Sequence, residues 1–109
     1  MHPPLPTREQ VFYDLCKNLH SVVEVKGTVV GFRTRLSRNR FGYKTQITLA
    51  PVSIAGVWVD HINVDVTVKM RTMMYAEGII IGHQVLLHGK LGLYQQVRFR
   101  ICAPSIRKL

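Results

Sequence analysis

An alternation of apolar and polar residues with a period of two constrains the fold of this chain more than any other feature. In "SVVEVKGTVVGFRTRLSR", Val23, Val25 and Val29 alternate with polar or charged neighbours, which is typical of a strand with one buried face. Gly27 and Gly31 lie inside this segment, and a glycine inside a strand usually marks a bulge or a sharp bend. The pattern therefore predicts a long first strand that bends.

Four more segments have strand-like patterns. They are "KTQITLA", "VWVDHINVDVTVKM", "GHQVLLHGKL" and "QVRFRICA", separated by "NRFGY", "PVSIAG" and "RTMMYAEG". In the second of them, Ile62, Val64, Val66 and Val68 share one face. "RTMMYAEG" breaks the alternation, and we expect a short helical turn there. The chain is thus predicted to form one small all-β domain of five strands.

The first part of the chain has helical spacing instead. Thr7 and Gln10 are placed as in a capping box, and apolar residues follow at intervals of three and four. This predicts an amphipathic helix over about residues 8–20, whose apolar side either packs on the domain or docks onto another protein. We expect residues 1–20 to form this N-terminal segment and residues 21–109 to form the binding domain.

Signals for catalysis or metal binding are weak. His83 and His88 are five residues apart and point to opposite sides of a regular strand, so a bend at Gly89 explains this segment better than a metal site. His61 and Asp65 share a face, but a solvated strand face is polar for ordinary reasons. No nucleophile, phosphate-loop or metal motif is present in the sequence. We expect no catalytic residues, no metal and no cofactor, and therefore no enzyme.

Several of these segments resemble one known fold. "GHQVLLHGKL" is similar to the fourth strand of the OB-fold family, "YQQVRFRICAP" to its last loop and strand, and the long glycine-containing segment to its first strand. The resemblance covers about Val22 to Ile106 through short patterns. Together with the strand count, it implies a five-stranded OB-fold barrel preceded by the N-terminal amphipathic helix.

The charge of the chain indicates a polyanionic partner. It has 15 Lys and Arg against 6 Asp and Glu, a formal net charge of +9. Basic and aromatic residues cluster where the loop between the first and second OB strands would project: Arg33, Arg35, Arg38, Arg40, Phe41, Tyr43 and Lys44. Arginine contacts phosphate through its planar fork, and aromatic rings stack on bases of any identity. The alternative is a solvated hairpin whose two aromatic rings fold back onto the domain.

Three further residues are candidates for the same surface. Arg98 and Arg100 alternate with Phe99, so they are expected on the outside of the last strand, where they either bind or guard a sheet edge. Trp58 has the parity of Ile62, which favours the core, but it lies near the start of its strand, where it could reach a base. Both interpretations of Trp58 remain open.

These features together resemble the single-stranded DNA-binding protein family. The resemblance implies a sequence-tolerant binder of single-stranded DNA, with RNA less favoured. The chain ends in "SIRKL" rather than in that family's acidic tail, so tail-mediated recruitment is not expected. This departure favours a narrower role, as an accessory factor in DNA replication or recombination, including on a mobile element. The alternative is a dimer or adaptor subunit of a nucleic-acid-processing complex. A homo-oligomer and a replication or recombination enzyme remain open as partners.

The location is inferred from what the sequence lacks. No apolar run approaches the roughly 20 residues that span a bilayer, and "MHPPLPTREQ" has no secretory signal pattern. We therefore expect a soluble cytoplasmic protein without a membrane partner. Cys16 and Cys102 are accordingly expected to be free thiols rather than a disulfide.

Overall fold

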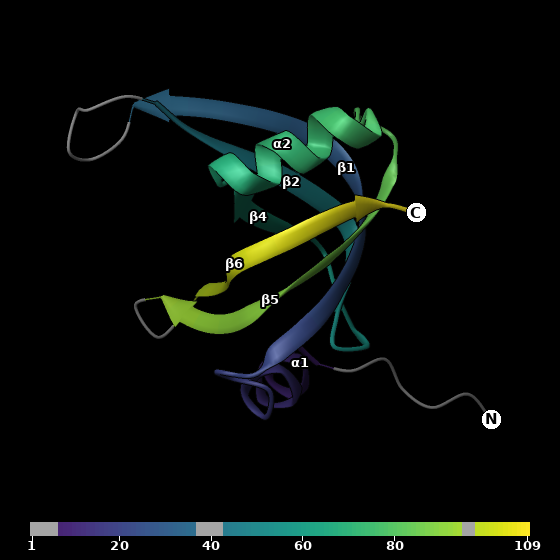
Figure 1. Ribbon diagram of the computed structural model, residues 1–109. Coiled ribbons are helices and arrows are strands. Elements are labelled where there is room, and N and C mark those ends of the chain that lie inside the picture. Colours follow the sequence, from purple (N-terminus) through teal and green to yellow (C-terminus); the bar gives the residue numbers. More distant parts are fainter. Residues whose placement is uncertain (1–6, 37–42, 95–97) are drawn as a thin grey trace.

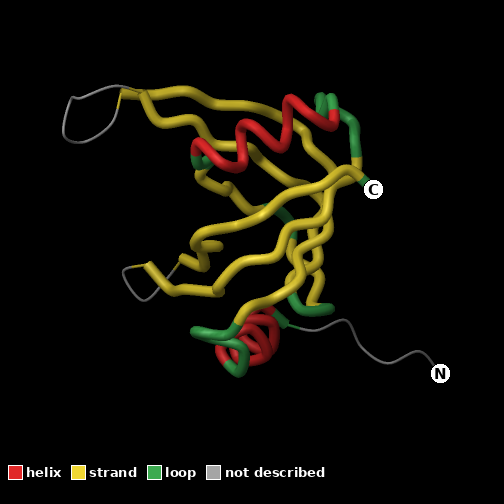
Figure 2. Tube along the Cα trace, viewed as in Figure 1, coloured by secondary structure: helices red, strands yellow, loops and turns green. Residues whose placement is uncertain are grey.

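The computed structural model describes residues 7–36, 43–94 and 98–109, and these ranges form six strands and two helices. In chain order they are α1 (Arg8–Cys16), β1 (Val22–Leu36), β2 (Tyr43–Ile54), β3 (Val57–Val59), β4 (Ile62–Asp65), α2 (Val68–Glu77), β5 (Gln84–Tyr94) and β6 (Arg98–Lys108). The strands make one antiparallel sheet (Figures 1 and 2).

Strand β1 is the centre of the sheet. It pairs with β2 on one side and with β5 on the other, and the hydrogen-bonded order is β3-β2-β1-β5-β6. Strand β4 pairs with β2 farther along the same edge as β3. Strand β6 comes close to β4, but no ladder joins them within the described ranges, so the sheet is open there. The predicted all-β architecture is confirmed at this level, with six strands instead of five.

Glycines lie where the long strands depart from regular pairing. The β1–β2 register shifts between Gly27 and Val29, and a Cβ on Gly27 would lie 3.0 Å from Leu49 Cβ. The β5–β6 register shifts between His88 and Lys90, on either side of Gly89. The irregularities predicted from these two glycines are therefore present, and each lets two strands approach more closely than side chains would allow.

The apolar face predicted for β1 forms part of the core. Val23, Val25 and Val29 are at most 5% exposed, whereas Glu24 and Lys26 between them are exposed. Every strand except β3 contributes fully buried or nearly buried apolar side chains to the same cluster, including Ile47, Leu49, Val52, Ile54, Ile62, Val64, Val85, Leu87, Leu91, Ile101 and Ile106.

Helix α1 begins as the sequence predicts and ends earlier. The side-chain oxygen of Thr7 accepts a hydrogen bond of 3.1 Å from the backbone N–H of Gln10, which is the predicted N-cap. The helix stops at Cys16, and the following residues form turns that lead into β1. Leu15 is 2% exposed and belongs to the core cluster, so the helix covers one end of the sheet with its apolar side.

The prediction of a strand continuing to Met70 is wrong, because helix α2 begins at Val68. The side chain of Thr67 caps it by accepting from the backbone N–H of Met70 at 3.1 Å, and Gly78 closes it with a φ of 62°. Met70 and Met74 are buried one helical turn apart, whereas Val68 is 79% exposed. Burial of the two methionines by a helix outweighs the local alternation of valines.

Two strands extend farther than predicted. The segment "PVSIAG" was expected to be a turn, but β2 continues to Ile54 and only Ala55 and Gly56 turn. Pro51 is accommodated because it lies in the irregular stretch of the β1–β2 ladder, where its missing N–H removes no regular bond. Strand β6 continues through Ile106 to Lys108 and pairs there with β5.

The arrangement in space leaves two hairpins projecting to the same side. The β1–β2 and β5–β6 hairpins both extend toward the left of Figure 1, and α2 lies between the first hairpin and β6. Helix α1 lies at the bottom of the view, on the side away from α2 (Figure 2). Neither helix is long and apolar enough to cross a membrane, and Cys16 and Cys102 are both free thiols.

Candidate functional site

The outer face of the β1–β2 hairpin carries part of the predicted basic cluster. Arg33 lies opposite Gln46 in the ladder, and the backbone of Arg35 lies opposite Lys44. Arg33 and Lys44 are exposed. Of the other predicted residues, only the backbone of Arg35 and Tyr43 is described, and Arg38, Arg40 and Phe41 lie outside the described residues. The hairpin thus presents two described cations to solvent.

Strand β4 adds a carboxylate to this outer face. Gln46 lies opposite Asp65, and its Nε2 donates to Asp65 Oδ1 at 2.7 Å. Lys44 Nζ lies 2.8 Å from Asp65 Oδ2. Directly opposed residues share a face, so Arg33, Gln46 and Asp65 form a row across the three strands. The positive charge of Lys44 is therefore partly neutralised, which the sequence pattern did not indicate.

Another polar side chain of β4 also forms a hydrogen bond to the neighbouring strand. Thr48 Oγ1 donates to Asn63 Oδ1 at 2.6 Å across β2 and β4. Of the acid–base cluster considered from the sequence, Asn63 and Asp65 are thus engaged in cross-strand contacts, and His61 is exposed. These two hydrogen bonds connect β2 and β4 within the sheet.

The opposite face of the same hairpin is apolar near the body of the sheet and exposed to solvent toward the tip of the hairpin. Phe32 lies opposite Ile47, which is fully buried, and Phe32 itself is 44% exposed. At the next pair on this face, two residues farther out, the hydroxyl oxygens of Thr34 and Thr45 are 3.4 Å apart, within reach of a weak hydrogen bond. Beyond the core, this inner face therefore offers an aromatic ring and two hydroxyls.

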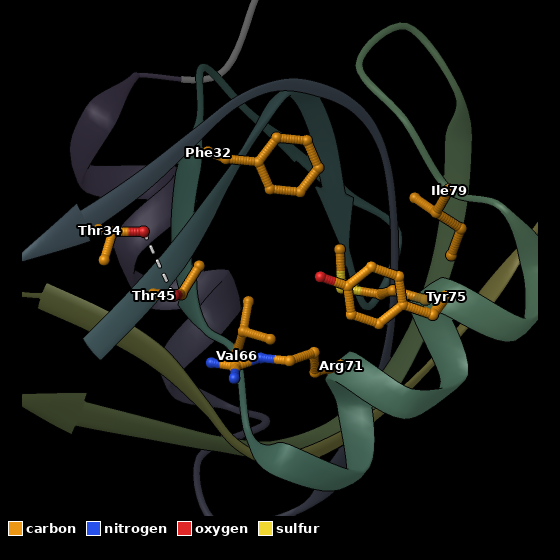
Figure 3. Close-up of a pocket in the computed structure, with 8 residues that line it drawn as sticks. Phe32, Thr34, Thr45, Val66, Arg71, Tyr75 and Ile79 are labelled. Atoms are coloured by element: carbon orange, nitrogen blue, oxygen red, sulfur yellow. Dashed lines mark hydrogen bonds between the residues drawn. The ribbon is translucent and has the colours of Figure 1, made fainter. Parts of the chain in front are cut away.

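Helix α2 faces these residues across a cleft of about 510 Å³ (Figure 3). The cleft is lined by Phe32, Thr34, Thr45, Val66, Arg71, Met74, Tyr75 and Ile79. Figure 3 shows the rings of Phe32 and Tyr75 pointing into the space from the hairpin and the helix respectively. Tyr75 is 82% exposed, and Arg71 is the one charged residue of the lining among the side chains that the structure describes.

Sequence reasoning missed the cleft, although weak signals for it existed. Phe32 alternates with two arginines in "FRTR", and Arg71 and Tyr75 are four residues apart, which places them side by side on a helix. The helix itself was not predicted at its full length, so this spacing could not be used. Phe32 and Tyr75 lie on opposite walls of the cleft only because the tertiary structure brings the hairpin and the helix together.

Trp58 lies on the surface, so of the two interpretations left open by the sequence, the core position is contradicted. Its side chain is 65% exposed, and its backbone pairs with Ser53 of β2. The strand breaks at Asp60 and His61, so the parity that Trp58 shares with buried Ile62 does not hold across the break. Trp58 borders a separate, smaller cleft of about 210 Å³ that is also lined by Lys26, Gly27, Thr28, Pro51, Gln84 and Leu109.

Arg98 and Arg100 lie on the other projecting hairpin. They pair with Tyr94 and Gly92 of β5 and are exposed, whereas Ile101 beside them is 5% exposed. This is the outward orientation that the sequence predicts. The two arginines belong to β5–β6 and the Arg33 face to β1–β2, so the predicted basic residues are divided between two hairpins.

The histidines that raised the question of a metal have local roles. His83 Nδ1 accepts from the backbone N–H of Ile80 at 3.1 Å, and His88 Nε2 lies 3.6 Å from Glu24 Oε2. In the parts of the chain that the structure describes, no three His, Cys, Asp or Glu side chains are grouped closely enough to hold a metal ion.

Comparison with known proteins gave no match to the chain among family models, curated proteins or solved structures. The function is therefore argued from the residues and the geometry.

Proposed function

We propose that this protein binds single-stranded DNA without strong sequence preference, on an OB-type barrel, as an accessory factor in DNA replication or recombination. The observation that carries the proposal is the exposed outer face of the projecting β1–β2 hairpin, where Arg33 and Lys44 lie beside the partly neutralising Asp65, in a chain with a net charge of +9. Such a face attracts phosphate by electrostatic steering and counterion release.

The order of the strands supports the OB-type part of the proposal. Strand β1 pairs with both β2 and β5, helix α2 connects β4 to β5, and β6 returns beside β5 and close to β4. If β3 and β4 are counted as one interrupted strand, this is the five-stranded arrangement of the OB fold with its helix before the fourth strand. The irregularities at Gly27 and Gly89 supply the bends that such a barrel needs.

The adaptor alternative has less support from the described residues. It relied on α1 as a docking helix, but Leu15 of that helix is buried in the core. The helix therefore uses its apolar side within the molecule. RNA shares the phosphate and base chemistry of DNA, so the distinction between them is left to the binding experiment.

The proposal is tested by fluorescence anisotropy with labelled single-stranded DNA, RNA and duplex oligonucleotides of matched sequence across a salt series. We expect single-stranded DNA to bind most tightly, with an affinity that falls steeply as salt rises. Absence of binding at low salt, or equal affinity for duplex and single strand, would refute the proposal.

A pair of variants tests the hairpin face. Arg33→Ala should weaken binding to every sequence and lower the slope of log affinity against log salt by about 0.7, the value for one phosphate contact of a single strand. Arg107→Ala removes the same charge from an exposed position near the end of β6 that lies away from the hairpin tips (Figure 1). It should leave the slope nearly unchanged, and equal effects of the two changes would argue against a localised site.

A further inference from the structure

The cleft between α2 and the β1–β2 hairpin has the size and the lining of a site for one nucleobase. Its volume of about 510 Å³ lies within the roughly 300–1,000 Å³ of small-ligand pockets. Phe32 on the hairpin and Tyr75 on the helix direct aromatic rings into it (Figure 3). The flat faces of such rings are the usual platforms for unpaired bases.

Both rings leave apolar surface exposed to solvent. Tyr75 is 82% exposed and Phe32 is 44% exposed, although Met74 beside Tyr75 is 9% exposed and packs into the core. Aromatic side chains have large apolar areas, and burying them is favourable. Two rings exposed on the walls of one cleft therefore retain apolar surface that a stacked ligand would cover.

The charge of the lining favours an anionic ligand. Among the described residues that line the cleft there is no Asp or Glu, and Arg71 is the one charged group. Among the described residues Arg71 has no ion pair. A guanidinium at the rim can contact the phosphate next to a base that occupies the cleft.

The two hydroxyls in the lining fit a ligand of variable sequence. The hydroxyl oxygens of Thr34 and Thr45 are 3.4 Å apart, so the hydrogen bond between them is weak. Each hydroxyl can therefore turn toward a ligand. A hydroxyl both donates and accepts, and it can therefore satisfy the edges of different bases. Stacking between Phe32 and Tyr75 is likewise indifferent to base identity.

We propose that this cleft receives one unstacked base of single-stranded nucleic acid, stacked against Phe32 and Tyr75, with Arg71 on a neighbouring phosphate. The inference rests on the proposed function and specifies how single strands are selected. A base inside a duplex is paired and stacked, so it enters the cleft only after costly extrusion. A base of a single strand enters without that cost.

The test uses anisotropy with a labelled oligothymidylate of about 16 nucleotides, the upper end of the site size of one OB domain, and with its duplex. Tyr75→Ala and Phe32→Ala should each weaken single-strand binding by about 5- to 150-fold and leave the salt slope unchanged. Arg71→Ala should lower that slope by about 0.7. Tyr75→Phe, which keeps the ring, should retain affinity within about twofold of the unsubstituted protein.

A matched control and a second measurement separate the possible outcomes. Tyr13→Ala removes another tyrosine that is 66% exposed, on α1 outside the cleft, and should have no effect on binding. Photocrosslinking with 5-iodouracil in the oligonucleotide, mapped by mass spectrometry, should mark Tyr75 or Phe32. Circular dichroism melts establish that each variant is folded.

Failure of this inference is distinguishable from failure of the proposed function. If the unsubstituted protein binds single strands but the ring variants bind equally well and crosslinks lie elsewhere, the base site is overturned and the function stands. If Tyr75→Ala weakens duplex and single-strand binding by the same factor, insertion of a base is also overturned. If the unsubstituted protein binds no oligonucleotide, both proposals fail.

Discussion

Lys44 Nζ lies 2.8 Å from Asp65 Oδ2, so the cation nearest the tip of β2 among the described side chains is held by a carboxylate of β4. Both side chains are about half exposed, 48% and 46%. The pair therefore contributes little to stability, in the range of about 0–1 kcal/mol for exposed ion pairs. Its main consequence is for the charge that the hairpin presents to a ligand.

Replacement of Asp65 by Asn should strengthen the binding of single-stranded DNA. Asn keeps an oxygen that can accept from Gln46 but no longer neutralises Lys44. If Lys44 then contacts a phosphate, the salt slope should steepen by about 0.7, while urea unfolding changes by less than about 1 kcal/mol. Asp60→Asn is the matched control, because Asp60 is exposed and the net charge changes equally. Equal slopes for both variants would show that Lys44 makes no phosphate contact.

Gly89→Ala should destabilise the protein substantially. A Cβ at this position would overlap Ile101 Cγ2 and lie 3.0 Å from the carbonyl oxygen of Cys102. Because these neighbours belong to the paired strand β6, we expect a loss of about 1–3 kcal/mol or more in the free energy of unfolding, measured by urea denaturation.

Gly31→Ala is the control for this prediction. Gly31 also lies in a long strand, but no atom comes within 4 Å of its Cβ position and its φ is not in the left-handed region. The substitution should be neutral or stabilise by roughly 0.4–1 kcal/mol. If Gly89→Ala is tolerated as well as Gly31→Ala, the close approach of β5 and β6 is not as described.

Leu15→Ala should uncouple α1 from the domain. Leu15 is 2% exposed within the core cluster, and truncation of such a side chain typically costs about 2–5 kcal/mol. Tyr13→Ala on the same helix removes a side chain that is 66% exposed and should change stability by less than about 0.5 kcal/mol. Thermal and urea unfolding measure both. Equal stability of the two variants would mean that α1 is a docking element rather than part of the core.

Two threonines of the α2 region should respond differently to replacement by alanine. Thr67 is the N-cap and accepts from the backbone N–H of Met70 at 3.1 Å, so Thr67→Ala should cost about 0.5–2 kcal/mol. Thr72 is exposed inside the helix and donates to the carbonyl of Val68, so Thr72→Ala should be neutral or slightly stabilising. Urea unfolding and amide exchange of the first turn of α2 distinguish them. A loss for Thr72→Ala that matches the loss for Thr67→Ala would contradict the cap.

Trp58 is the single tryptophan of the chain, so its fluorescence measures its own exposure to solvent. Trp58 is 65% exposed, so acrylamide, which is uncharged, should quench its fluorescence efficiently in the folded protein. Trp58→Phe should change stability by less than about 0.5 kcal/mol. Strong protection from acrylamide without ligand would show that Trp58 is buried after all. Protection that appears only when an oligonucleotide is added would place Trp58 in a ligand contact.

Features encoded by near neighbours could be predicted from the sequence. The alternation around Val23 and Val25 sets which face of β1 is buried, because successive side chains of a strand point in opposite directions. The cap formed by Thr7 and Gln10 is likewise a contact over three residues. The outward position of Arg98 follows from the same alternation.

Errors arose where two local patterns competed. The valines up to Val68 continue a strand pattern, yet a helix begins there because Met70 and Met74 are buried on its inner side. The parity that Trp58 shares with Ile62 favoured the core, but the strand breaks before Ile62, and a break of two residues removes the relation between their faces. In both cases the deciding contacts are with residues far away in the sequence.

The charge of +9, the faces of the long strands and the start of α1 depend on composition or on residues a few positions apart, so the amino-acid sequence is enough to predict them. The neutralisation of Lys44 by Asp65 and the position of Phe32 across a cleft from Tyr75 follow from the folded arrangement of the chain. These pairs join segments whose approach is set by the packing of the whole core. That packing is the sum of many weak contacts between residues that are distant in the sequence. The local spacing of apolar residues therefore does not predict it.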